Sequence, residues 1–283
     1  MAPSEGTLSY CGEQVRRNDR DRFLTCLFAP PERREWLFGL YAFNVEVAKT
    51  REVVSQPMLG QIRLQWWRDA LDELYVGTVR AHEVLQSLAP AVATGRLERD
   101  RFEAVLLARE ADLEEGPPPD MAALEAYADG SSGALALLAL EALDAGSDAA
   151  ATAARHAGIA WALTGLLRAV PYHARIRRIH LPADLMAAHG VSATRLFEGR
   201  RPDGLPAVAA AIGGVARAHV EAARAVRRGV GRAAMPVLLQ AAMAQTYLGV
   251  LERAGWDPFA PRVPMAHPLL QLRLAWRAFI GRY

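Results

Sequence analysis

Apolar residues recur at helical spacing along nearly the whole chain of 283 residues. No stretch shows the alternating β-branched residues, bounded by turns, that are typical of a half-buried strand. The chain is therefore predicted to be all-α. The helices that this spacing predicts are Pro31–Ser55, Leu59–Tyr75, His82–Ala93, Arg99–Glu115, Met121–Leu143, Ala149–Val170, Leu205–Arg228, Met235–Ala254 and Pro268–Tyr283.

Two short breaks interrupt this pattern. Residues 116–119 (Gly-Pro-Pro-Pro) end one helix and start the next, and residues 199–204 form a polar turn. Neither is long enough to be a flexible linker, so residues 1–283 are expected to form one domain with a substantial core. Segments 133–143 and 157–167 are apolar on more than one face, which predicts that they lie inside a large bundle.

Composition narrows the classes of partner and compartment. The formal net charge is +2 and the basic residues are scattered among acids, so no nucleic-acid partner is expected. Cys11 and Cys26 are interpreted as two reduced thiols. No apolar run approaches the length of a membrane span, and the N-terminus, with Glu5 and Glu13, lacks the order of a signal peptide. We expect a cytoplasmic protein, in solution or peripherally bound to the inner face of the cytoplasmic membrane.

Four stretches resemble, in order and spacing, the squalene/phytoene synthase family, whose members join two isoprenoid diphosphates head to head inside a helical bundle. The resemblance covers almost the whole chain and implies the isoprenoid synthase fold, a single large bundle with a central cavity. The four stretches are Leu27–Arg34 continuing through Leu40–Phe43, Leu64–Asp69 with its paired tryptophans, Gly165–Arg168 with Ala174–Pro182, and Tyr247–Pro258.

The resemblance also implies two DxxxD motifs, on facing helices, that hold Mg²⁺ for departure of the diphosphate. Aspartates four residues apart share one face of a helix, so both carboxylates can reach one ion. In this chain Ala48 and Glu52 occupy the first pair of positions, and Ala169 and His173 occupy the second. One carboxylate remains, and histidine is a poor ligand for Mg²⁺. Both motifs are degenerate, so we expect no metal, no other cofactor and no catalytic residue.

Other acids do not obviously replace the missing aspartates. Glu46 and Glu52 are six residues apart and point in different directions around a helix. Asp69, Asp72 and Glu73 follow the paired tryptophans at helical spacing, and we interpret them as a solvated face rather than a rebuilt metal site.

Basic residues near these motifs are candidates for an anion pocket. Arg168 matches a family arginine that is expected to face the diphosphate. With fewer acids the mouth of the former site should become electropositive and hold an anionic headgroup without metal. The alternative is that these side chains form ordinary surface ion pairs with Glu46, Glu52 and their neighbours. The cationic candidates are Lys49, Arg51, Arg168 and Arg175.

His173 has two interpretations. Together with Tyr172 and Arg175 it is a candidate to contact a ligand in the former diphosphate pocket. Because no carboxylate partner is evident in the sequence, the interpretation as a structural histidine of the bundle is favoured slightly.

The stretch Tyr41–Glu46, whose two end residues are also pocket candidates, resembles the family branch that includes a mitochondrial assembly factor for respiratory complex I. Our leading hypothesis is a non-catalytic bacterial relative that binds a protein partner or a lipid near the membrane during complex assembly. The alternative is a head-to-head isoprenyl diphosphate synthase in which Glu52 and other acids rebuild a Mg²⁺ site. A third hypothesis is a metal-independent module that binds an isoprenoid diphosphate or an anionic lipid.

The last predicted helix mixes apolar residues with Arg273, Arg277 and Arg282. This composition is compatible with a helix in a membrane interface. A terminal helix packed on the bundle is the favoured interpretation.

Overall fold

The computed structural model describes residues 8–283, so Glu5 lies outside the described part. Within that range all regular elements are helical and no strand occurs, which confirms the all-α class. The helices are α1 (Tyr10–Asn18), α2 (Arg20–Cys26), α3 (Pro31–Ala48), α4 (Thr50–Val53), α5 (Pro57–Tyr75), α6 (Glu83–Val92), α7 (Arg99–Glu110), α8 (Met121–Ala128), α9 (Ala134–Ala142), α10 (Asp148–Arg168), α11 (Val170–Arg175), α12 (Ala183–Ala188), α13 (Ala193–Phe197), α14 (Leu205–Ala225), α15 (Met235–Arg253) and α16 (Leu270–Ile280).

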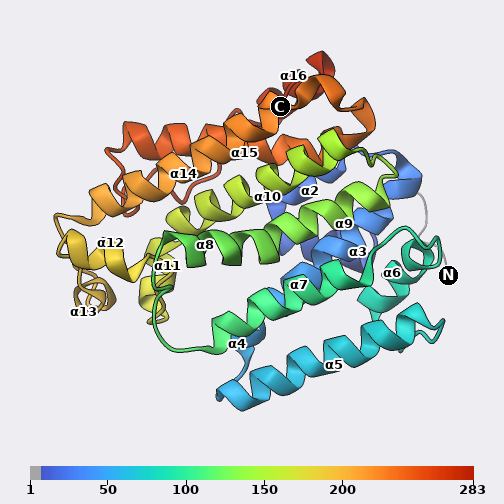
Figure 1. The fold of residues 1–283 in the computed structure, drawn as a ribbon, viewed down its shortest axis with the longest axis horizontal. Coiled ribbons are helices and arrows are strands. Elements are labelled where there is room, and N and C mark those ends of the chain that lie inside the picture. Colours follow the sequence, from blue (N-terminus) through green and yellow to red (C-terminus); the bar gives the residue numbers. More distant parts are fainter. Residues whose placement is uncertain (1–7) are drawn as a thin grey trace.

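Three long helices, α10, α14 and α15, pack against one another on one side of the bundle (Figure 1). On the other side of α10, α9 contacts both α3 and α7, and α5 packs outside α7. The short helices α11, α12 and α13 gather at one end of the molecule (Figure 1). The elements that carry the former motif positions reach toward this same end.

Small residues bring α10 close to its neighbours. Ala153, Ala157 and Ala160 are fully buried. A methyl group on Gly158 would collide with the backbone carbonyl of Ser132, in the π-helical turn Asp129–Gly133 that joins α8 to α9. Close helix packing is therefore the role of Gly158.

The predicted helices are in place, but three of them are interrupted. Pro31–Ser55 breaks at Lys49 into α3 and α4, Met121–Leu143 contains the π-helical turn, and Ala149–Val170 ends at Arg168, where α11 follows after one residue. The spacing did not predict α1, α2, α12 and α13, because helices of five to nine residues are too short to show a full apolar stripe.

One expectation about membrane segments was wrong. Residues Arg232–Arg253, which include α15, are long and apolar enough to cross a membrane by length and composition. In the structure 78% of this apolar window is buried inside the bundle, which is the position of a core helix.

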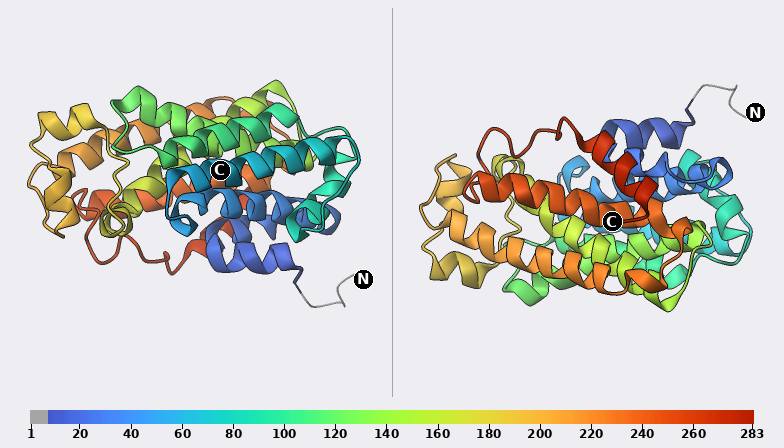
Figure 2. Two further views of the ribbon diagram at one scale, coloured as in Figure 1. Left: turned by 90° about the horizontal axis from the view of Figure 1, so that it is seen from below. Right: turned by 90° about the horizontal axis from the view of Figure 1, so that it is seen from above.

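The last helix, α16, packs on the outside of α15 through the buried side chains of Leu270 and Leu274 (Figure 2, right). It is therefore a terminal helix on the bundle, as the favoured interpretation expected. Most of its other large apolar residues remain exposed.

Candidate functional site

The two regions that carry the former metal motifs face each other, and each region contains a break between two helices. Lys49 separates α3 from α4, and Ala169 separates α10 from α11; both residues have ψ near zero (−7° and −1°), so each helix bends there. Glu52 on α4 contacts Tyr172 on α11, and burial together with this carboxylate raises the pKa of the Tyr172 hydroxyl. The pairing of these two regions is the one that the family resemblance implied.

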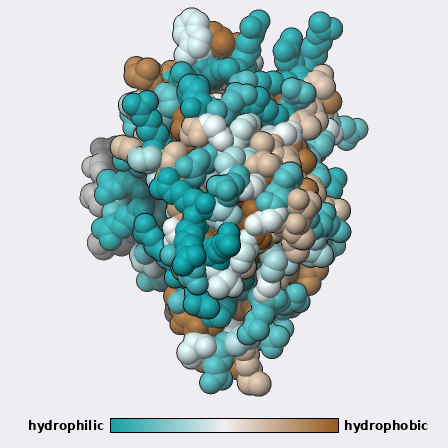
Figure 3. Space-filling view, turned by 90° about the vertical axis from the view of Figure 1, so that its left-hand side faces the viewer, coloured by the Kyte–Doolittle hydropathy of each residue, from teal (hydrophilic) through white to brown (hydrophobic). Residues whose placement is uncertain are grey.

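A pocket of about 820 Å³ opens beside this contact. Its walls come from α4, the loop after α7, α11 with the loop that follows it, and α13. Arg51, Glu52 and Tyr172 contribute to the rim, and Ile176 and Phe197 supply apolar surface. Hydrophilic residues cover most of this end of the molecule, with smaller hydrophobic areas between them (Figure 3). The volume is in the range that binds small organic ligands.

The charges around this pocket balance. Its lining holds three arginines and three glutamates, so the expected excess of positive charge is not found there. The acids come mainly from the loop after α7, which the sequence analysis did not connect with this site. The six residues are Arg51, Arg177, Arg178, Glu52, Glu114 and Glu115.

Arg168 lies away from the pocket rim. Its guanidinium sits 3.5 Å from the centre of the Tyr247 ring, donates to the Val263 carbonyl oxygen (3.3 Å) and pairs with Asp21 (3.4 Å). These contacts tie α10 to α2 and α15, so the side chain is occupied by structural partners in this fold.

The predicted candidates Lys49, Glu46, Arg175 and Tyr41 also lie outside the pocket lining. Lys49 donates to the Asn18 side chain (2.7 Å), and Glu46 pairs with Arg63 (2.5 Å). Arg175 is exposed. Tyr41 is buried in the core, where Gln240 donates to its hydroxyl at 3.4 Å and burial raises the pKa of its hydroxyl.

His173 is largely buried and pairs with a second imidazole, that of His180, at 4.6 Å between ring centroids. Burial lowers the pKa of His173 to about 3, with a smaller contribution from His180, and burial lowers the pKa of His180 to about 4. Both rings are therefore neutral near pH 7. The Nδ1 atom of His173 is buried and finds no hydrogen-bond partner within residues 8–283.

A buried polar network lies next to these imidazoles, and sequence reasoning missed it. Arg109 on α7 donates to Asp112 (3.3 Å), to the Tyr127 hydroxyl on α8 (2.5 Å) and to Asn44 on α3 (3.3 Å). Tyr127 in turn donates to Asp112 (3.1 Å), and Arg178 approaches the same carboxylate at 4.0 Å. The network crosses the space between α3, α7 and α8.

Part of this network is accessible from the surface. Asp112, Tyr127 and His180 line a second, smaller pocket of about 240 Å³, which shares the loop after α7 with the first pocket. In the sequence, Arg178 and His180 stand out only as members of the family-like stretch Ala174–Pro182. No periodicity distinguishes Arg109 or Asp112 from the solvated charges beside them.

The residues at the motif positions do not fit a Mg²⁺ site. Ala48 and Ala169 offer no donor, Glu52 is a single carboxylate, and the imidazole of His173 is turned into the interior beside His180. Within residues 8–283 no group of three or more His, Cys, Asp or Glu side chains is arranged to hold a metal ion, even though three glutamates line the larger pocket.

The acids after the paired tryptophans form the solvated face that was expected. Asp72 pairs with Arg99 (2.8 Å), and Glu73 pairs with Arg80 (2.7 Å). They lie on α5, away from the residues that line the larger pocket.

Known proteins resemble this chain over most of its length. The family model for squalene/phytoene synthase matches residues 15–278. The chain belongs to the squalene/phytoene synthase family. Complex I assembly factor 6 of Mus musculus is 32% identical over 278 residues, covering 98% of this chain and 84% of that protein. Presqualene diphosphate synthase of Rhodopseudomonas palustris is 29% identical over 195 residues, covering 69% of each chain.

Solved structures agree on the fold. The squalene synthase of Alicyclobacillus acidocaldarius superposes with a TM-score of 0.77 at 19% identity, over 88% of this chain and 94% of that one. This likeness shows that the chain has the isoprenoid synthase fold. Because the sequence identity is low, the chemistry of the chain must be argued from its own residues.

Proposed function

We propose that this protein is a non-catalytic assembly factor for respiratory complex I. The observation that carries the proposal is the similarity to complex I assembly factor 6, which extends over 98% of the chain. The similarity to presqualene diphosphate synthase is lower in coverage. The protein would act in the cytoplasm, at the inner face of the membrane in which complex I is built.

The composition of the former metal site supports a role without catalysis. Ionisation of an isoprenyl diphosphate requires cations that neutralise the departing pyrophosphate, and hard oxygen ligands must hold them. Of the four motif positions, Glu52 alone supplies a carboxylate, and its neighbour is the Tyr172 hydroxyl. We therefore propose that the protein works without Mg²⁺. The competing prenyl transferase would need Mg²⁺ held by carboxylates outside the two motifs.

A second candidate function is the metal-independent binding of an isoprenoid diphosphate or an anionic lipid. The pocket of about 820 Å³ favours it, because apolar walls stand beside Arg51, Arg177 and Arg178. Such a ligand would be compatible with an assembly role, but its anionic group would have to bind these arginines in the presence of the three glutamates of the lining.

Deletion of the gene in its own organism tests the assembly role. The expected result is a lower amount of assembled complex I on native gels and lower NADH:quinone oxidoreductase activity, with succinate:quinone oxidoreductase unchanged as the control. The wild-type gene should restore complex I. So should a Glu52→Gln gene, because the proposal assigns no metal to this carboxylate. Unchanged complex I after deletion would refute the proposal.

A further inference from the structure

The last helix turns most of its large apolar side chains toward solvent. Leu272 is 69% exposed, Trp276 is 62% exposed and Phe279 is 75% exposed. The rings of Trp276 and Phe279 stack at 6.1 Å between centroids, so they form one continuous surface, which we call the α16 ridge. An exposed apolar surface of this kind on a folded bundle marks an interaction site.

The α16 ridge is held firmly on the bundle. Leu270 and Leu274 are buried against α15. Beyond the helix, Tyr283 donates from its hydroxyl to the Ala223 carbonyl oxygen (3.1 Å), and its own carbonyl oxygen accepts from Arg224 (2.7 Å). The ridge is thus presented in a fixed position, and binding would not have to order it.

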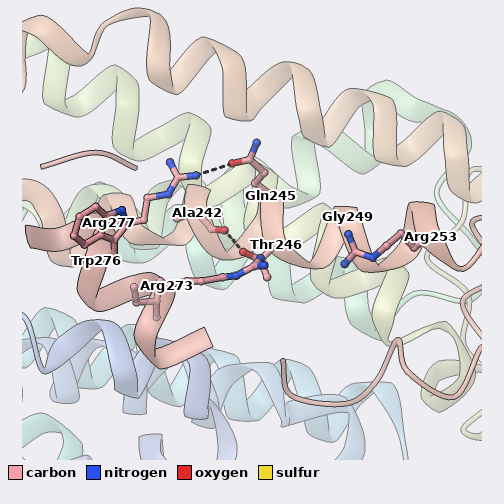
Figure 4. Close-up of a pocket in the computed structure, with 9 residues that line it drawn as sticks. Ala242, Gln245, Thr246, Gly249, Arg253, Arg273, Trp276 and Arg277 are labelled. Carbon is pink, nitrogen blue, oxygen red and sulfur yellow. Dashed lines mark hydrogen bonds between the residues drawn. The ribbon is translucent and has the colours of Figure 1, made fainter. Parts of the chain in front are cut away.

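A basic groove runs beside the ridge, between α15 and α16. It has a volume of about 290 Å³, and Arg253, Arg273 and Arg277 line it together with Trp276 (Figure 4). Arg277 donates to Gln245 on α15 at 3.4 Å, and the guanidinium of Arg253 folds back over Gly249.

These three arginines have no anionic partner within residues 8–283. In that part of the chain the lining of the groove contains no acidic residue. None of the ion pairs found within residues 8–283 includes Arg253, Arg273 or Arg277. The acid next in sequence, Glu252, pairs instead with Arg217 on α14 at 2.6 Å.

The positive field of the groove reaches its titratable neighbours. Burial lowers the pKa of His267, and the charges of Arg273 and Arg253 lower it further. Burial also lowers the pKa of Arg224, with the next largest contribution from Arg277. The groove is therefore a place where an added anion would relieve repulsion.

We propose that α16 docks this protein on the surface of an anionic phospholipid bilayer, with a lipid phosphate in the groove formed by Arg253, Arg273 and Arg277. One guanidinium group can donate two parallel hydrogen bonds to two oxygens of the same phosphate. The ridge, with Trp276 at its centre, inserts between headgroups, where tryptophan is favoured. A second copy of this chain would cover the ridge but would bring the same positive charge to the groove, so charge complementarity selects the anionic membrane.

The proposal rests on the membrane-proximal role proposed above, and it specifies the surface that makes contact. The test is cosedimentation of the full chain with phosphatidylcholine vesicles that contain or lack phosphatidylglycerol. Because lipid binding is measured without complex I, a negative result here leaves the assembly role to its own experiment.

Two double variants separate the parts of the surface. In Arg273→Gln/Arg277→Gln the affinity for anionic vesicles should fall about 25-fold, since each arginine near an anionic surface contributes a factor of about five. Trp276→Ser/Phe279→Ser should reduce binding while leaving the charge unchanged. The control for charge is Arg195→Gln/Arg200→Gln at the far end of the molecule. The control for exposed apolar residues is Met58→Ser/Ile62→Ser on α5, and both controls should bind as wild type.

The outcomes are distinct. Binding that requires phosphatidylglycerol and weakens in both the groove and the ridge variants supports the proposal. Equal binding to neutral vesicles, or equal loss in the control variants, would overturn it. A protein that does not bind vesicles, and that sediments as a dimer which Trp276→Ser dissociates, would overturn the proposal. The ridge would then be a surface for self-association. Thermal unfolding of each variant checks that it is folded.

Discussion

Replacing Asp112 by alanine should destabilise the bundle by about 3–5 kcal/mol. The carboxylate accepts hydrogen bonds from Arg109 (3.3 Å) and from Tyr127 (3.1 Å), and 11% of its side chain is exposed. Its removal leaves the Arg109 guanidinium, whose side chain is 14% exposed, without its nearest anion. A buried charge that loses its partner costs about 3–5 kcal/mol, because the low-dielectric interior does not replace the lost interaction.

Urea denaturation followed by circular dichroism measures this change in the free energy of unfolding. With an unchanged m value of about 3 kcal/mol/M, the midpoint should fall by about 1–1.7 M. Tyr127→Phe removes a single hydroxyl from the same network and should cost about 1–2 kcal/mol. Glu252→Gln removes an exposed ion pair with Arg217 and should change stability by less than about 1 kcal/mol.

The order of these three variants is the critical result. If Asp112→Ala cost no more than Glu252→Gln, the network around Arg109 would be solvated in solution and the reasoning from its burial would be refuted. If instead the m value changed, the native or unfolded state would have changed its compactness, and the comparison would be repeated by thermal unfolding.

Further predictions concern other buried groups. The pKa values of His173 and His180 are lowered from about 6.5, so the neutral rings contribute to the free energy of unfolding above pH 6.5. This contribution is lost as the pH falls toward 4, by about 1.4 kcal/mol per pH unit for each ring. His173→Gln should therefore reduce the difference in stability between denaturation curves at pH 7 and pH 5. Arg168→Met should cost about 2–3 kcal/mol in thermal unfolding, since it leaves the largely buried Asp21 without its cationic partner, whereas a loss below about 0.5 kcal/mol would indicate a solvated arginine. Cys11 and Cys26 are buried, and burial raises the pKa of Cys11 to about 11, so iodoacetamide should modify neither thiol until the protein is unfolded; rapid labelling of the native protein would contradict this.

The helical architecture was predictable because long amphipathic and apolar segments carry a strong periodic signal. The break at Lys49 was not, since that residue bends the helix with an ordinary right-handed backbone conformation and no proline or glycine marks it. The end of α10 was placed within two residues of its true position by the same helical spacing.

The candidate site was predictable only in outline. The family resemblance implied that the helix of Ala48 and Glu52 faces the helix of Ala169 and His173, but it did not predict the contact between Glu52 and Tyr172. The network of Arg109, Asp112 and Tyr127 comes from different elements that meet only when the bundle forms, and charged residues in a sequence are ordinarily read as solvated. The positions of Lys49 and Arg168 depend on partners in α1 and α2, two helices that the spacing did not predict.

Release of pyrophosphate tests most directly the claim that this fold is retained without metal-dependent chemistry. Purified protein is incubated with farnesyl diphosphate and geranylgeranyl diphosphate, with and without Mg²⁺, beside a catalytically active family member as the positive control. The predicted result is no release above the protein-free rate in either condition. Mg²⁺-dependent release that follows the protein through purification would contradict the account and would show that carboxylates outside the four motif positions hold the metal.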